Sequence, residues 1–123
     1  MADAPDPKTA PTAPAAELEP ASIRLVLVDD HTVVRQGLRM VLSLEPDLDI
    51  VGEAGNGQEA LELSRRLRPQ VMLMDLLMPV MDGVSAIRAI KRELPDTEIV
   101  ALTSVLEDRL VIDAVEAGAA GYL

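Results

Sequence analysis

Residues 71–83, with the sequence VMLMDLLMPVMDG, hold an apolar run that ends on one carboxylate, Asp75. The run shows no polar alternation, which is the pattern of a strand covered on both faces within a parallel sheet. Pro79 and Gly83 then turn the chain toward a helical pattern. We therefore expect a buried strand whose exposed tip is Asp75.

A second apolar run, residues 23–28, also ends on acidic side chains. Asp29 and Asp30 follow it directly, and a helical pattern begins at Thr32. In open parallel sheets, ligands bind beyond the carboxyl ends of the strands, where the strand order reverses. If these two strands are neighbours, three carboxylates meet at that edge of the sheet.

Strand and helix patterns alternate along the chain from residue 23 onward. Further strands are expected at residues 48–54, 98–103 and 119–123, and helices at residues 32–45, 57–67, 83–94 and 107–117. Asn56 and Asp82 are the expected N-caps of the second and third helices. The alternation predicts an α/β fold, a flavodoxin-like three-layer α/β/α sandwich with a parallel five-stranded sheet of order 2-1-3-4-5.

Composition indicates one folded domain, residues 23–123. Residues 1–22 carry five of the nine prolines and one leucine, so we expect them to form a disordered Pro/Ala-rich lead. The chain has no cysteine and a net charge of −10, which excludes thiolate chemistry and argues against contact with nucleic acid or a membrane. No apolar run approaches the length of a membrane span, so the protein is expected in the cytoplasm.

The three carboxylates predict a cation site. Two like charges about 4 Å apart repel by roughly 4 kcal/mol at an effective dielectric constant near 20, so such a cluster takes up protons or binds a cation. Oxygen donors favour Mg²⁺, and a carboxylate such as Asp75 can act as a nucleophile toward a phosphoryl group. Thr103 would point its hydroxyl toward the same pocket. His31 adjoins it, but we interpret this imidazole as a polar residue near a helix start.

Four segments together resemble the receiver domains of bacterial two-component response regulators. They are LVLVDDH (residues 25–31), MLMDLLMPVMDG (72–83), ALTS (101–104) and AGAAGYL (117–123). The forms VDDHTVVRQGLRMVL and EAGAAGYL are most similar to the NarL/FixJ branch. Members of that branch carry a C-terminal LuxR-type helix-turn-helix that binds DNA, and this chain contains no such output domain.

The resemblance implies a role for each matching residue. Asp75 would accept a phosphoryl group from a sensor histidine kinase. Asp30 would ligate Mg²⁺ directly and Asp29 directly or through water, with the backbone carbonyl of Leu77 as a third protein ligand. The domain would be a phosphoacceptor switch, with self-catalysed phosphoryl transfer and hydrolysis only, rather than an enzyme.

Two further positions match the switch residues of the family. Thr103 would be the switch hydroxyl, and Tyr122, the only aromatic residue, would be the switch aromatic. The family also places a lysine two residues beyond the position of Leu123, followed by a fifth helix, and neither lies within this sequence. Because strands three to five would then lack cover on the face of the first helix, we expect a homodimer or an element-exchanged oligomer.

Other functions fit the sequence less well. A phosphorylation-independent receiver-like interaction or dimerisation module is the main alternative, favoured by the missing lysine and disfavoured by Asp75 and Thr103. A phosphatase of the haloacid-dehalogenase kind needs a second acid where Leu77 stands. A nucleotide-binding flavodoxin-like protein needs a glycine-rich phosphate loop, which the sequence lacks.

Overall fold

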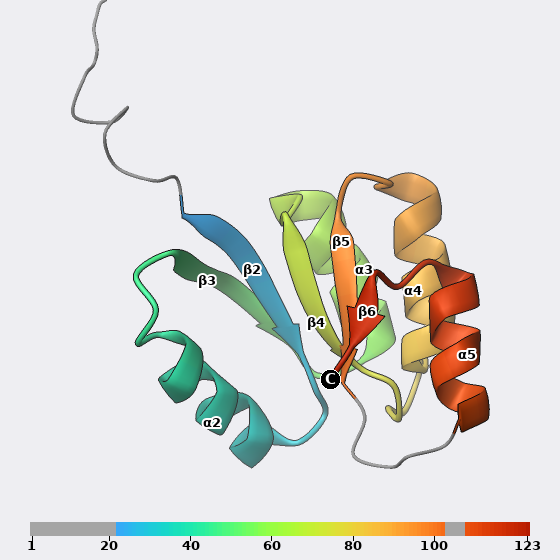
Figure 1. The fold of residues 1–123 in the computed structure, drawn as a ribbon, viewed down its shortest axis with the longest axis horizontal. Coiled ribbons are helices and arrows are strands. Elements are labelled where there is room, and N and C mark those ends of the chain that lie inside the picture. Colours follow the sequence, from blue (N-terminus) through green and yellow to red (C-terminus); the bar gives the residue numbers. More distant parts are fainter. Residues whose placement is uncertain (1–21, 103–107) are drawn as a thin grey trace, which may run out of the picture.

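The computed structural model describes residues 22–102 and 108–123 as five strands and four helices (Figure 1). In chain order they are β2 (Ile23–Val28), α2 (Thr32–Leu42), β3 (Leu48–Ala54), α3 (Gly57–Leu67), β4 (Val71–Asp75), α4 (Gly83–Glu93), β5 (Glu98–Leu102), α5 (Asp108–Ala117) and β6 (Gly121–Tyr122). None of these helices has the length and apolar character that crossing a membrane requires. The predicted lead lies outside the described residues, apart from Ser22.

The sheet confirms the predicted topology. All neighbouring strands are parallel, in the order β3-β2-β4-β5-β6, which is 2-1-3-4-5 in sequence order. Val28, the last residue of β2, pairs with Met74 of β4. The residues that follow each of them, Asp29 and Asp75, therefore leave adjacent strands at the same edge.

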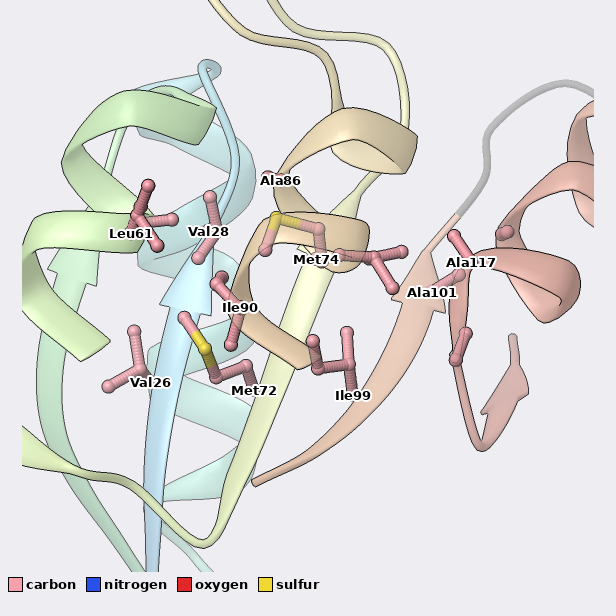
Figure 2. Close-up of a cluster of buried hydrophobic side chains, with 14 of the residues drawn as sticks. Val26, Val28, Leu61, Met72, Met74, Ala86, Ile90, Ile99, Ala101 and Ala117 are labelled. Carbon is pink, nitrogen blue, oxygen red and sulfur yellow. The ribbon is translucent and has the colours of Figure 1, made fainter. Parts of the chain in front are cut away.

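One face of the sheet carries most of the core. Alternate residues of β2, β4 and β5 point toward α3, α4 and α5, as period-two side-chain geometry requires. Figure 2 shows this layer, in which Val26, Val28, Met72, Met74, Ile99 and Ala101 from the strands meet Leu61, Ala86, Ile90 and Ala117 from the helices. The buried strand pattern of residues 71–74 is thus confirmed on this face.

The other face is covered more thinly. Leu25, Leu27 and Leu73 form its small buried cluster, against which Leu38 and Leu42 of α2 pack. Figure 1 shows α2 apart from the other helices, beside the β3 edge. No residue of α2 is buried, so this helix contributes little to the core.

The helix boundaries follow local signals in the sequence. Asn56 accepts a hydrogen bond from the backbone N–H of Glu59 (2.9 Å), and Asp82 accepts one from that of Ser85 (2.8 Å), so both predicted N-caps are confirmed. Helix α2 ends at Leu42 rather than at residue 45, because the N–H groups of Leu44 and Glu45 donate to carbonyls only three residues back, those of Val41 (3.3 Å) and Leu42 (3.1 Å). The last strand is two residues long, shorter than predicted, because only Val100 and Ala101 of β5 pair with it.

Candidate functional site

Three carboxylates and one imidazole meet at the carboxyl edge of β2 and β4. Each of Asp29, Asp30, His31 and Asp75 offers one ligand atom, and these four atoms all lie within 4.8 Å of one another. The parallel pairing of β2 with β4 produces this convergence, since both strands end at the same edge. The sequence prediction that Asp29, Asp30 and Asp75 come together is therefore confirmed.

The carboxylates are withdrawn from solvent to different degrees. Asp29 and Asp75 are buried, with 5% and 7% of their surface exposed. The Oδ1 atom of Asp30 is also buried, and it has no hydrogen-bond partner among the described residues. A buried carboxylate oxygen without a partner is costly unless a proton or cation satisfies it. The cluster therefore fits a cation with oxygen ligands.

Burial raises the pKa of the Asp75 carboxyl above its usual value. The nearby charges of Asp29 and Asp30 raise it further, while the backbone N–H of Leu77, which donates to Asp75 Oδ1 at 3.2 Å, acts in the opposite direction. Ionising Asp75 thus costs more in the protein alone than it does in water. A cation at the cluster would favour the charged, nucleophilic form of this carboxylate.

His31 lies among these carboxylates, where the sequence predicted only that it adjoins the pocket as a polar residue near a helix start. Its Nδ1 atom lies 3.0 Å from Asp29 Oδ1, to which it donates a hydrogen bond, and 3.1 Å from Asp30 Oδ1. The second contact is close but lacks hydrogen-bond geometry, which leaves the Asp30 oxygen unpaired. The hydrogen bond to Asp29 and the charge of Asp30 raise the pKa of His31. Its position directly after the acidic pair was the available signal.

The loop between β4 and α4 is tightly built behind Asp75. The backbone N–H of Gly83 donates to the Leu76 carbonyl (3.1 Å), which brings the start of α4 against the end of β4. A Cβ atom at Gly83 would lie 2.3 Å from the Asp75 backbone oxygen, so only glycine fits. Val80 in this loop has φ +72°, a conformation that β-branched residues rarely adopt.

A groove runs from the acidic cluster along α2. Its volume is about 610 Å³, and its lining combines the polar Asp29, His31 and Asp75 with the apolar Val34, Leu38, Leu102 and Leu123. The groove follows the thinly covered face of the sheet. The cluster is therefore reachable from solvent although two of its carboxylates are buried.

The remaining predicted site residues are Thr103, Tyr122 and Leu77. Thr103 lies outside the described residues. Tyr122 is on β6, where it pairs with Ala101 of β5, and 55% of its surface is exposed. Leu77 is exposed and follows Asp75 by two residues; its carbonyl as a metal ligand stays a prediction.

The family described as the response regulator receiver domain matches residues 25–123. The chain belongs to this family. It is 48% identical over 101 residues to the transcriptional regulatory protein LiaR of Bacillus subtilis (strain 168), an alignment that covers 82% of this chain and 48% of the relative. It is 43% identical over 102 residues to the response regulator protein VraR of Staphylococcus aureus (strain NCTC 8325 / PS 47), covering 83% and 49%.

Solved receiver structures share the fold. The signal receiver domain of the response regulator NarL from Mycobacterium tuberculosis superposes with a TM-score of 0.80 at 39% identity, covering 85% of this chain and 84% of that one. A LuxR-family response regulator from Aurantimonas sp. SI85-9A1 gives 0.79 at 35% identity, covering 83% and 73%. The predicted family, branch and fold class are confirmed.

The chain is thus the receiver domain of a two-component response regulator of the NarL/LuxR family. Such domains are signalling switches. The chain spans about half the length of the curated relatives it matches. The activities of those relatives as whole proteins are therefore only proposed for this protein, in the next section.

Proposed function

We propose that this receiver domain accepts a phosphoryl group on Asp75 from a phosphohistidine of a sensor histidine kinase, with Mg²⁺ at the acidic cluster. The observation that carries the proposal is the convergence of Asp29, Asp30 and Asp75 at the carboxyl edge of β2 and β4. A single acid at a strand end could be explained equally well as a helix cap, without any bound ion. Three converging carboxylates, two of them buried, must take up protons or bind a cation, and the oxygen donor set supports the cation.

Asp29, Asp30 and Asp75 would hold Mg²⁺, with the Leu77 carbonyl as a further ligand. The buried, unpartnered Asp30 Oδ1 atom supports this assignment, since an oxygen donor set suits a hard ion. When bound, Mg²⁺ neutralises charge on the carboxylates and on the oxygens of the phosphoryl group. Asp29 and Asp75 also line the groove, through which a phosphodonor can approach the cluster.

The transfer itself needs one nucleophilic oxygen. Asp75 Oδ1 accepts the Leu77 N–H, and no hydrogen bond to Oδ2 occurs among the described residues, so Oδ2 is the attacking atom. It forms a bond to phosphorus while the phosphorus–nitrogen bond of the donor breaks, and the electron pair returns to the imidazole of the kinase. Water later hydrolyses the acyl phosphate, so the domain both makes and loses its phosphoryl group.

The readout would pass through the switch pair and an output domain. Thr103 is the hydroxyl that responds to the phosphoryl group, and Tyr122 on β6 is the aromatic partner that changes rotamer with it. More than half of the Tyr122 surface is exposed, which supports such a change because it leaves space for another rotamer. Relatives named as transcriptional regulators support a cytoplasmic parent protein that binds DNA through a separate domain.

Intact-protein mass tests the proposal. After incubation with Mg²⁺ and acetyl phosphate, the protein should gain one phosphoryl group, and the Asp75→Asn variant should gain none. Asp96→Asn is the matched control, because Asp96 is exposed in the turn between α4 and β5 and should gain the group as the unaltered protein does. No gain in the unaltered protein would contradict the proposal and favour a phosphorylation-independent interaction module.

A second copy of this chain is the proposed occupant of the thinly covered face. Two apolar side chains that line the groove on this face, Val34 and Leu123, are exposed. The same patch on two copies can form an isologous contact, with or without exchange of elements.

Light scattering over a range of protein concentrations tests this association. The measured mass should rise toward that of a dimer, and Val34→Lys should abolish the rise. Val115→Lys is the matched control, since Val115 is similarly exposed on α5, on the opposite side of the sheet. A monomer mass at all concentrations would rule the dimer out.

A further inference from the structure

His31 is placed among the carboxylates as a ligand would be. Its Nδ1 atom is 3.0 Å from Asp29 Oδ1 and 3.1 Å from Asp30 Oδ1. In an octahedral site with bonds of about 2.1 Å, neighbouring donor atoms lie about 3.0 Å apart, which is √2 times the bond length. The nitrogen therefore already lies at the spacing of a neighbouring donor from each of the two oxygens.

The hydrogen bond to Asp29 does not satisfy this group of atoms. Asp30 Oδ1 stays buried and unpartnered although the imidazole nitrogen is only 3.1 Å away. When a buried oxygen lies next to a nitrogen without a hydrogen bond between them, the arrangement is that of two ligand atoms that bind the same metal ion. This orphaned oxygen is the second observation, beside the cluster itself, that points to an ion.

Helix capping does not explain the position of the imidazole, whose hydrogen bond goes to Asp29 instead. His31 is the N-cap residue of α2, but its side chain makes no capping hydrogen bond. Two thirds of the side chain is exposed. The start of α2 is therefore independent of the imidazole, and residue 31 can be changed without removing a cap.

We propose that His31 Nδ1 is a ligand of the metal site. This nitrogen makes the site bind transition-metal ions such as Ni²⁺ more tightly than a site of carboxylates alone would. Imidazole suits Ni²⁺, Cu²⁺ and Zn²⁺, whereas Mg²⁺ prefers oxygen. The ion takes the place of the Nδ1 proton, and Asp29 and Asp30 complete the mixed donor set. The inference rests on the proposed cation site and adds to it a nitrogen ligand and a metal class. Such ions would compete with Mg²⁺ beside Asp75.

The composition makes this inference unusually simple to test. His31 is the only histidine of the chain, and there is no cysteine. An imidazole-dependent affinity measured on tag-free protein can therefore come only from this residue. Isothermal titration calorimetry at one fixed pH, with Ni²⁺ and separately with Mg²⁺, should be run on the unaltered protein, His31→Ala and Asp30→Asn.

His31→Ala should lower the Ni²⁺ affinity by about 10-fold or more and leave the Mg²⁺ affinity within about 2-fold. Asp30→Asn should weaken both ions. Retained Mg²⁺ binding also shows that the His31 variant is folded. In Co²⁺-loaded protein, a coordinated imidazole should give one hyperfine-shifted ring N–H signal that His31→Ala lacks.

Two results would overturn the inference in distinguishable ways. If His31→Ala leaves the Ni²⁺ affinity unchanged, or changes both affinities by the same factor, His31 acts at most through charge and only this inference fails. If the unaltered protein binds neither ion, the proposed cation site fails with it. Phosphorylation of Asp75, followed by mass, reports separately on the proposed function.

Discussion

The Cα atom of Gly83 faces the backbone carbonyl of Asp75 so closely that a Cβ atom there would lie 2.3 Å from the oxygen and 2.6 Å from the Leu76 Cα. Both obstacles are backbone atoms, so no side chain can rotate away. We predict that Gly83→Ala destabilises the domain by about 1–3 kcal/mol and lowers the yield of phosphorylated Asp75, because α4 and the end of β4 must separate. Urea unfolding measures the first effect and intact mass the second.

Gly37 provides the matched control for this substitution. It lies inside α2, and a Cβ atom there would meet nothing within 4 Å. Gly37→Ala should therefore stabilise the helix by roughly 0.5–1 kcal/mol, because alanine loses less backbone entropy on folding. Equal effects of the two substitutions on the free energy of unfolding would show that the close backbone approach at Gly83 does not exclude a Cβ atom there.

Asp75→Asn should stabilise the protein at neutral pH in the presence of a chelator. Burial raises the pKa of Asp75 above its unfolded value, so the ionised carboxylate disfavours the folded state at every pH above the folded pKa. As the pH falls through that pKa, the folded protein takes up the proton and the penalty disappears. The melting temperatures of the two proteins should differ at pH 7 and converge in acid. A lower melting temperature for Asp75→Asn at pH 7 would contradict the prediction.

Much of the fold follows from residues whose local pattern has one physical meaning. The apolar run before Asp75 predicts a buried strand. The predicted strand order then places the acidic tips together, as the pairing of Val28 with Met74 confirms. Asn56 and Asp82 cap helices because their side chains reach a backbone N–H three residues later. These are local or register-based relationships, so the sequence predicts them.

Other features depend on packing that no local pattern encodes. Val34, Leu38 and Val41 are apolar residues at helical spacing in α2, yet only Leu38 is half-buried, whereas Val34 and Val41 are exposed. Periodicity reports that a face is apolar but not what covers it. The orientation of the His31 imidazole toward two carboxylates is likewise a tertiary result. Its residue type alone favoured a polar role at the helix start.

Val80 combines a β-branched side chain with φ +72° and is 82% exposed. No burial of its side chain offsets the steric cost of this backbone conformation, which is about 1–2 kcal/mol for a residue with a Cβ atom. Val80→Gly should therefore raise the free energy of unfolding by about 1 kcal/mol, and Val80→Ala by less because it keeps the Cβ atom. Urea unfolding of the three proteins checks the order, and destabilisation by glycine would show that the strain is absent.

Mg²⁺ should raise the melting temperature of the protein in a concentration-dependent way. An ion that binds only the folded state stabilises it by about 2.7 kcal/mol at a concentration 100 times its dissociation constant. Asp30→Asn should remove most of this shift, since Asp30 Oδ1 is the buried donor without a protein partner. A shift that is equal in Asp30→Asn would place the ion elsewhere on this acidic protein.

Two ion pairs join α2 to the sheet, in addition to the packing of the half-buried Leu38 and Leu42. Arg35 Nε lies 3.2 Å from Glu53 Oε1 and an Arg39 guanidinium nitrogen lies 2.6 Å from Glu53 Oε2, while no α2 residue is buried. Glu53→Gln should therefore loosen α2 locally, which amide hydrogen exchange would report as faster exchange in α2 with little change in β4 and β5.

Glu93→Gln is the matched control. It breaks the pair with Arg65 that joins α4 to α3, but those helices also bury Ala60, Leu61, Ile87 and Ile90, so their protection should persist. Because exposed ion pairs contribute only about 0–1 kcal/mol each, a detectable loss confined to α2 requires that apolar packing there is weak. Unchanged exchange in α2 would show that Leu38 and Leu42 suffice to hold it.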